Sequence, residues 1–260
     1  MVRRTKADAE ATRLSLLDAA EQLFQARGVS RTSLNDIATA AGTTRGAIYW
    51  HFKDKADLFN AMMDRVTTPM EQAIAQAETV ETPLQQVRTS VLTALRKTAT
   101  DEQARRVFEI ATQQVEFNGE MLAVRERKLK WSDDYRRQLA RQFKAAAAET
   151  QIQLPAGPRQ AALGLQAILT GLLHNWLLSD GDFDLVRVGT QTVDIYLAGL
   201  GFRPVEPRRA TAVPSTKAPT VPSKTPILAA SAAALPGAKA RVAMKRAMVK
   251  PIPQKQATGT

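Results

Sequence analysis

The sequence has 260 residues, of which 44% are hydrophobic, so it is long enough for one or two domains with a buried core. It contains no cysteine, which excludes disulfides, thiolate metal sites and cysteine nucleophiles, and fits a reducing cytoplasm. No apolar run approaches 18 residues and no apolar segment follows the charged first residues, so we expect neither a membrane span nor a signal peptide.

The formal net charge of +11 is unevenly placed along the chain. Residues 204–260 hold ten Lys or Arg and a single acid, which leaves a charge of only about +2 for residues 1–203. The overall basicity therefore says little about the folded part. An argument for nucleic-acid binding has to rest on where individual basic side chains lie.

The first 60 residues carry the spacing of short helices. Apolar residues recur at helical intervals at Leu14, Leu17, Ala20 and Phe24, which predicts an amphipathic helix that ends near Gly28. Further helix starts are indicated by Ser33 with Asp36, by Thr43 or Thr44, and by Asp54 or Lys55. Two short helices joined at Gly42 form a helix-turn-helix pattern, because glycine adopts the left-handed turn conformation at little cost.

Three rings stand side by side at Tyr49, Trp50 and His51, in the second of these short helices. Consecutive residues of a helix point about 100° apart, so one buried face cannot take all three. We expect Ile48 and Phe52 to pack in the core. The exposed rings are then expected to face a partner, although partial packing of Tyr49 or Trp50 remains an alternative.

Residues 10–59 resemble the N-terminal domain of the TetR family of repressors. The run TRGAIYWHFKDK at 44–55 is very similar to that of its AcrR and TtgR type, which controls multidrug efflux pumps. The opening MVRRTK and the segments VEFNGEM at 115–121 and GLLHNWLL at 171–178 are also similar to that subgroup. The resemblance covers about residues 1–202 and implies an all-α DNA-binding protein, with Thr43 standing where an apolar residue is usual.

The resemblance implies that the second short helix of the motif is a recognition helix for the major groove. Arg45 lies near its start, and a bidentate contact to guanine is the commonest specific use of arginine. Lys55 begins the next helix and suits a phosphate, together with the amides of that helix. The set expected to contact DNA is Ser33, Asn35, Thr44, Arg45, Gly46, Tyr49, Trp50, His51, Lys53 and Lys55.

The middle of the chain reads as helices with short breaks and shows no alternation typical of strands. The expected helices are 55–78, 83–98, 102–117, 119–150, 159–179 and 183–200. We therefore divide the chain into a helix-turn-helix DNA-binding domain at 1–56, an all-helical ligand-binding and dimerisation domain at 57–203, and a tail at 204–260.

The helix expected at 159–179 is apolar nearly all the way round, so it must be covered on more than one side. Together with the helix at 183–200 it suits a face that pairs with a second copy in a four-helix bundle. Members of the TetR family dimerise through their last two helices, which agrees with this reading. A monomer that buries both helices internally is the alternative.

The resemblance also implies a pocket for a small hydrophobic effector among the middle helices, with mostly apolar walls and a few polar groups. The expected lining residues are Phe108, Thr112, Gln113, Phe117, Thr170 and His174. Ordinary core packing of the two phenylalanines and a hydrogen bond from Thr170 to its own helix remain open as alternatives. The polar groups differ from those expected in TtgR-like sequences, so the resemblance does not identify the effector.

Residues 204–260 hold nine of the 13 prolines and are expected to be disordered, with 237–250 as the one stretch that favours a helix. The basic residues of this tail would add non-specific attraction to phosphates. A neutral extension is the alternative.

No enzyme is expected, since the sequence has no His–acid–Ser pattern, no glycine-rich phosphate loop and no HExxH motif. Two histidines, His51 and His174, are too few for a histidine metal site, and no cofactor is expected. Three functions remain: a ligand-released repressor that binds the double-stranded operator of an efflux operon as a homodimer, a TetR-type regulator of another pathway such as lipid metabolism, and an architectural protein that coats DNA.

Overall fold

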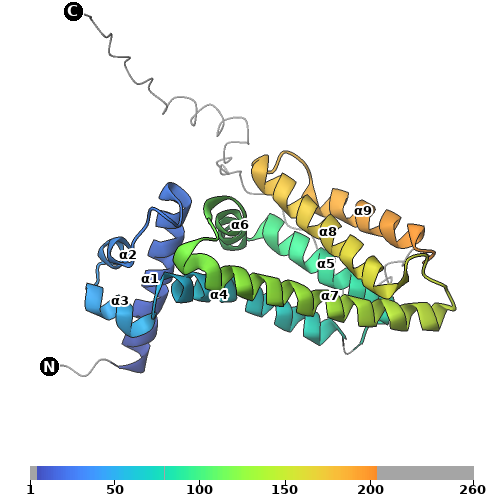
Figure 1. The fold of residues 1–260 in the computed structure, drawn as a ribbon, viewed down its shortest axis with the longest axis horizontal. Coiled ribbons are helices and arrows are strands. Elements are labelled where there is room, and N and C mark those ends of the chain that lie inside the picture. The colour runs from blue at the N-terminus through green and yellow to red at the C-terminus, as the bar shows by residue number, and fades with distance from the viewer. Residues whose placement is uncertain (1–4, 79, 204–260) are drawn as a thin grey trace, which may run out of the picture. The chain divides into compact units, whose positions relative to one another are not determined.

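The structure, a computed structural model, describes residues 5–78 and 80–203, which belong to one compact unit, Met1–Pro207. Over these residues the fold is all helical and contains no strand, which confirms the expected fold class. Figure 1 shows α1, α2 and α3 gathered at one end, and α5, α7, α8 and α9 side by side at the other. The tail expected at 204–260 lies outside the described residues.

The three N-terminal helices are α1 (Lys6–Arg27), α2 (Leu34–Ala40) and α3 (Arg45–His51). Each begins after a residue whose side chain accepts a backbone N–H of the first turn: Thr5, Ser33 and Thr44. The predicted starts of the second and third helices are confirmed, with Thr44 as the N-cap of the third.

The first hydrophobic core joins these helices to α4 (Lys55–Glu78). Fully buried residues come from each of them, including Phe24 of α1, Ile37 of α2 and Ile48 of α3. Leu58 of α4 is also fully buried in this core. Burial of each such side chain stabilises the fold by about 1.5–3 kcal/mol, so the recognition helix is held on a packed base. The N-terminal part of α4 therefore packs as part of the same core as the helix-turn-helix.

The remaining helices are α5 (Pro83–Thr100), α6 (Glu102–Glu109), η1 (Ile110–Gln114), η2 (Gly119–Met121), α7 (Leu122–Thr150), α8 (Gly157–Leu178) and α9 (Leu185–Gly199). The helix predicted at 102–117 is wrong in its second half. There α6 gives way to a π-helical turn, η1, followed by extended backbone at Val115. The last carbonyl of η1, that of Gln114, accepts a hydrogen bond from the amide of Val29 at 3.0 Å, so it joins the α1–α2 loop.

The second hydrophobic core lies among α5, α7, α8 and α9. Two of the polar contacts among its helices hold α9. The Arg88 guanidinium of α5 donates to both carboxylate oxygens of Asp194 in α9, at 2.7 and 3.0 Å, and these hydrogen bonds raise the pKa of Arg88. The Tyr196 hydroxyl of α9 donates to the Ala161 carbonyl of α8 at 2.9 Å. The last two helices are therefore fixed against each other and against α5.

Among the described helices, α8 has the length and apolar composition that a membrane span requires, and 39% of its most apolar stretch is buried. A core helix of a soluble bundle can have the same length and apolar composition. Here α8 packs on α7 and α9 and carries a buried Gln166, whose side chain donates to the Ser132 hydroxyl at 2.7 Å. One such helix is weak evidence for a membrane span.

Candidate functional site

The turn between α2 and α3 fixes the geometry of the helix-turn-helix. Gly42 has φ +66°, and a Cβ at this position would meet nothing within 4 Å, so the backbone conformation and not space calls for glycine. The amide of Thr43 donates to the Ala38 carbonyl at 2.9 Å, and Ala38 is buried where the helices approach. The departure at Thr43 therefore leaves the turn intact.

The start of α2 is held by a reciprocal capping box. The amide of Ser33 donates to Asp36 at 2.9 Å, and the amide of Asp36 donates to the Ser33 hydroxyl oxygen at 3.2 Å. The hydrogen bonds from Ser33 hold the pKa of Asp36 below its usual value. Ser33 and Asn35 are both exposed at this helix start, as an approach to DNA requires.

The three adjacent rings of α3 meet different surroundings, as their spacing predicts. Ile48 is fully buried, whereas Tyr49 is 49% exposed and Trp50 is 73% exposed. His51 is partly buried, with its ring 4.6 Å from that of Trp50 in an edge-on arrangement. Large exposed rings on a short, well-packed helix indicate a binding surface rather than a core.

The first turn of α3 presents an exposed cation to solvent. Arg45 is exposed, with its guanidinium carbon 5.9 Å from the centre of the Tyr49 ring. Gly46 is exposed as well, and a Cβ there would come no nearer than 3.9 Å to the Thr44 hydroxyl. Packing within the chain therefore does not require glycine at this position. Close approach of an outside surface is a sufficient reason for it.

Lys55 is the predicted DNA contact that the structure places differently. Its ammonium donates to the carbonyls of Val29 and Thr32, both at 3.1 Å, and lies 2.7 Å from a carboxylate oxygen of Glu120. The side chain is 9% exposed. An ammonium has three protons and all three are engaged here, so the expected free phosphate anchor does not fit this conformation.

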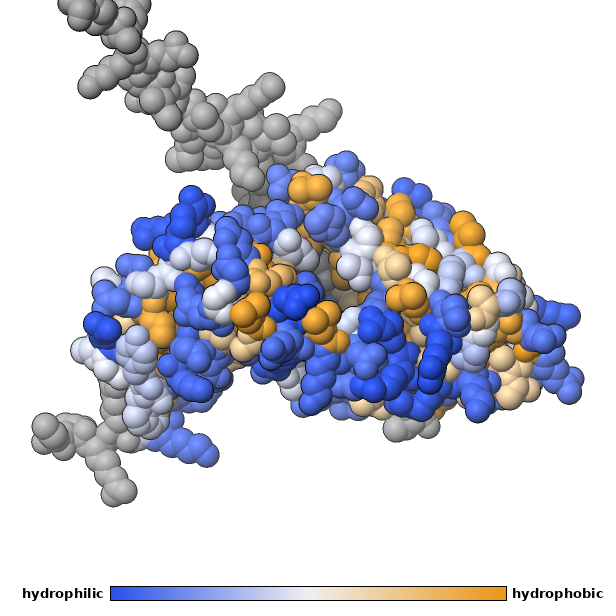
Figure 2. Space-filling view, in the orientation of Figure 1, coloured by the Kyte–Doolittle hydropathy of each residue, from blue (hydrophilic) through white to orange (hydrophobic). Residues whose placement is uncertain are grey.

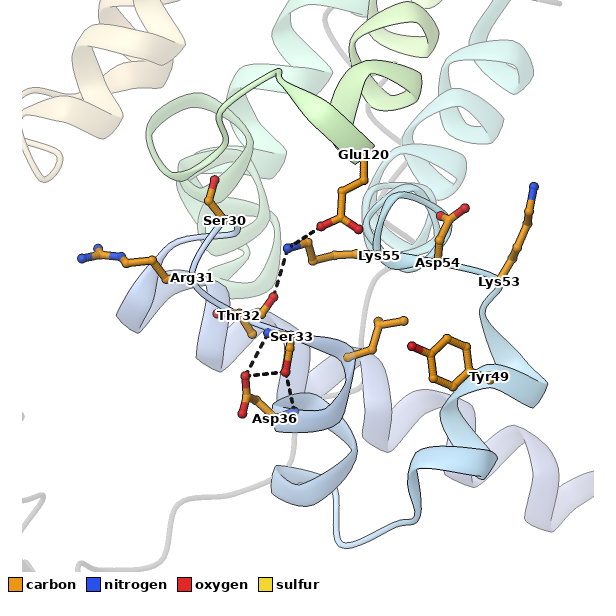
Figure 3. Close-up of a pocket in the computed structure, with 11 residues that line it drawn as sticks. Ser30, Arg31, Thr32, Ser33, Asp36, Tyr49, Lys53, Asp54, Lys55 and Glu120 are labelled. Carbon is orange, nitrogen blue, oxygen red and sulfur yellow. Dashed lines mark hydrogen bonds and ion pairs between the residues drawn. The ribbon is translucent and has the colours of Figure 1, made fainter.

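Lys55 and Glu120 line an open recess of about 400 Å³, together with several of the predicted DNA contacts. Figure 3 shows Ser33, Tyr49, Lys53 and Lys55 around it, with Glu120 reaching in from η2. The lining residues are Ser30, Arg31, Thr32, Ser33, Leu34, Asp36, Tyr49, Lys53, Asp54, Lys55 and Glu120. Cations and acids both line the recess, so an approaching phosphate meets attraction and repulsion.

A buried carboxylate that the sequence analysis did not single out joins α1 to α4 and α6. Glu21 is 1% exposed and accepts from the Arg65 guanidinium, from Gln103 at 3.2 Å and from Arg106 at 3.4 Å. Arg65 also donates to Asp18 at 2.8 Å. The signal was present in the sequence, because Glu21 falls on the apolar face of α1, between buried residues.

The predicted effector residues of α6, η1 and the segment after it lie at the junction of the two cores. Phe108 is partly buried and packs against both cores. Thr112 and Gln113 are exposed, and the Thr112 hydroxyl donates to the Phe108 carbonyl at 2.7 Å. Phe117 is partly buried under the ammonium of Lys128, 5.3 Å from the ring centre, and burial lowers the pKa of Lys128. Figure 2 shows the surface hollowed near this junction.

The predicted pocket residues of α8 do not face the interior. Thr170 and His174 are exposed, because the inner side of α8 is filled by other apolar residues of the second core. They share an outward stripe with Leu163, 54% exposed, and Leu178, 64% exposed. Ile195 of α9 is 72% exposed, and Figure 2 shows apolar side chains along both helices. Exposed apolar side chains gathered in this way often mark an interaction surface.

Across the described part of the chain, no three His, Asp or Glu side chains gather in a way that could hold a metal ion.

Two family models match most of the chain. Residues 16–62 match the model for bacterial regulatory proteins of the tetR family, and residues 82–202 match the C-terminal region of the MAATS-type transcriptional repressors.

Relatives are similar over nearly their whole length. The transcriptional repressor BepR of Brucella suis is 37% identical over 201 residues, which is 76% of this chain and 96% of BepR. The regulator TtgR of Pseudomonas putida is 34% identical over 206 residues, covering 78% of this chain and 98% of TtgR. NalD, the secondary repressor of the MexAB-OprM multidrug efflux pump in Pseudomonas aeruginosa, is 35% identical with a TM-score of 0.68, over 74% of this chain and 98% of NalD.

Proposed function

Because this chain belongs to the TetR family of bacterial regulatory proteins, we propose that it represses a multidrug efflux operon and is released from DNA by hydrophobic, drug-like compounds. The observation that carries the proposal is the exposed outer face of α3, where Arg45, Tyr49 and Trp50 stand on a buried base. Relatives named as efflux repressors, such as NalD, support the choice of target. Nothing in the chemistry of the site suggests an enzyme.

In this proposal α3 enters the major groove of DNA. Arg45 reads a base edge from the first turn, while Tyr49 and Trp50 meet sugar, phosphate or thymine methyl groups. Ser33 and Asn35 at the start of α2 contact the opposite wall of the groove. Lys53 is exposed next to α3 and meets the phosphate backbone. Phosphate contacts set the register of the domain, and Arg45 supplies the sequence preference.

The proposed homodimer forms through α8 and α9. The outward stripe of α8 contains Leu163, Thr170, His174 and Leu178, and α9 adds the exposed Ile195. Exposed leucine and isoleucine side chains on two neighbouring helices are costly in water and suit a four-helix bundle made by two copies. Two copies of α3 then bind half-sites of a palindrome about one helical turn apart, or a multiple of it. Such a protein acts in the cytoplasm, where the DNA is.

The effector acts by shifting a population. A ligand at the junction near Phe108 has to bind the released conformation better than the DNA-binding one, otherwise the equilibrium does not move. The contacts from α6 to Glu21 and from η1 to Val29 link that junction to α1 and to the loop before α2. A displacement of α6 or η1 therefore reaches the helix-turn-helix through bonded groups.

Footprinting on the regulatory DNA around the coding gene tests this proposal. We expect protection of one site with two-fold symmetry, lost when a suitable hydrophobic compound is added. Triclosan is a reasonable first compound, because SmeT, a 33% identical structure covering 73% of this chain with a TM-score of 0.64, is described in complex with it. Uniform protection of all DNA would favour an architectural protein. A symmetric site beside genes unrelated to efflux would favour a regulator of another pathway.

A further inference from the structure

The contact between Lys55 and Glu120 crosses from the helix-turn-helix to the start of the effector helices. Lys55 is the first residue of α4, and Glu120 lies in η2, 65 residues later in the chain. Their ammonium and carboxylate groups are 2.7 Å apart, the distance of a charge-assisted hydrogen bond. The position of Glu120 is fixed from behind, because the next residue, Met121, is 2% exposed in the first core.

The carboxylate of Glu120 has the chemistry of a phosphate oxygen and a place near where a phosphate would lie. Both groups are anions that accept from an ammonium through oxygen. The side chain of Glu120 is 54% exposed and lines the same recess as Ser33, Tyr49 and Lys53 (Figure 3). Lys55 thus keeps two protons on the chain's own carbonyls, and the third is the one that an outside anion would take.

We propose that Glu120 is a built-in competitor of DNA, whose carboxylate occupies the Lys55 ammonium until an operator phosphate replaces it. The inference rests on the proposed function, in that α3 and the residues around the recess face DNA. It adds a role for an effector-domain residue that does not itself read DNA. Its position, two residues before the start of α7, makes the strength of this competition depend on how the effector helices are arranged.

The proposal predicts the direction in which loss of the Glu120 charge changes the affinity for DNA. In the free protein Lys55 is already satisfied, so DNA binding exchanges one anion for another and gains little from this contact. Without the charge of Glu120, the same contact is gained in full, and repulsion between the carboxylate and nearby phosphates disappears. Loss of the carboxylate charge should therefore tighten DNA binding, whereas loss of a structural brace would weaken it.

The test compares Glu120→Gln with Glu116→Gln, which removes the same charge from the same segment without touching Lys55. Glu116 is exposed, and its carboxylate accepts a hydrogen bond from the Asn118 side-chain amide at 3.3 Å. Affinity for an operator duplex and for a scrambled duplex is measured by fluorescence anisotropy. We expect Glu120→Gln to bind both duplexes about threefold to tenfold more tightly than wild type, as for one partly exposed ion pair, and Glu116→Gln to change little.

Two further readouts separate competition from folding effects. The gain in DNA affinity of Glu120→Gln over wild type should shrink as the salt concentration is raised, because salt screens the ion pair that the wild type has to break. In a Lys55→Met background the substitution at Glu120 should lose its effect, which a double-mutant cycle measures. If Lys55→Met fails to fold, the salt series on Glu120→Gln decides alone.

The proposal is overturned if Glu120→Gln binds no more tightly than Glu116→Gln, if it binds more weakly than wild type, or if its advantage does not depend on salt. A failure of the proposed function is seen separately, as a wild type that does not distinguish operator from scrambled duplex. In that case the ratio of the dissociation constants of the variants is still measured on whichever duplex the wild type binds.

Discussion

Replacing Glu21 by glutamine tests whether the buried carboxylate joins the DNA-binding helices to the effector helices. The substitution keeps the size of the side chain and removes its charge. Arg65, whose side chain is 17% exposed, then loses its buried partner and keeps only Asp18, and Arg106 loses its carboxylate as well. Breaking a fully buried ion pair costs about 3–5 kcal/mol. Because both arginines retain some solvent, we expect a loss of about 2–4 kcal/mol in the free energy of unfolding.

The matched control is Asp18→Asn, which removes the other carboxylate from the same arginine. Asp18 is 61% exposed, so its loss should cost less than about 1 kcal/mol. Both variants are measured by urea unfolding at one protein concentration, because the stability of a dimer depends on concentration. If Glu21→Gln costs no more than Asp18→Asn, the buried network contributes little, and the link between α1 and α6 has to be sought elsewhere.

Three further predictions concern the interface, the turn and a buried phenol. Leu163→Glu should convert the dimer to a monomer in sedimentation equilibrium, whereas Leu129→Glu on α7, at the same 54% exposure, should not; equal behaviour of the two would contradict the assigned interface. Gly42→Ala should lower the free energy of unfolding by about 1–2 kcal/mol because of its positive φ, and an unchanged melting temperature would argue against the turn geometry. Burial raises the pKa of Tyr135 to about 12, so stability should fall as pH rises from 10 toward 12, where the unfolded chain releases a proton that the folded one keeps; Tyr135→Phe should lack this loss.

Local signals in the sequence were sufficient for the N-terminal helices. The capping box of Ser33 and Asp36, the cap at Thr44 and the glycine at the turn act within four residues, so they can be recognised without knowledge of the fold. The same holds for the division between buried and exposed residues of α3. It follows from helical spacing, because one buried face cannot take three consecutive rings.

Long-range partners explain where the structure departs from the expectations drawn from the sequence. Lys55 meets a carboxylate 65 positions away, and no local pattern announces Glu120. The second half of the helix predicted at 102–117 is interrupted where Gln114 bonds to Val29, although neither glycine nor proline marks a break there. On α8 the apolar character extends nearly all round, so spacing alone cannot say which side faces inward. The structure leaves Thr170 and His174 exposed, although both are expected from the sequence to line the pocket.

The central claim is that α3 reads sequence, and the preference for operator over scrambled DNA tests it most directly. The dissociation constants for both duplexes are measured by fluorescence anisotropy at one salt concentration, for wild type, for Arg45→Ala and for Arg96→Ala, an exposed arginine of α5. We predict that the wild type prefers the operator by about a thousandfold or more. Arg45→Ala should weaken operator binding by about 1–3 kcal/mol and scrambled binding much less, while Arg96→Ala changes neither. A wild type with equal affinity for both duplexes, or an Arg45→Ala variant weakened equally on both, would contradict the account.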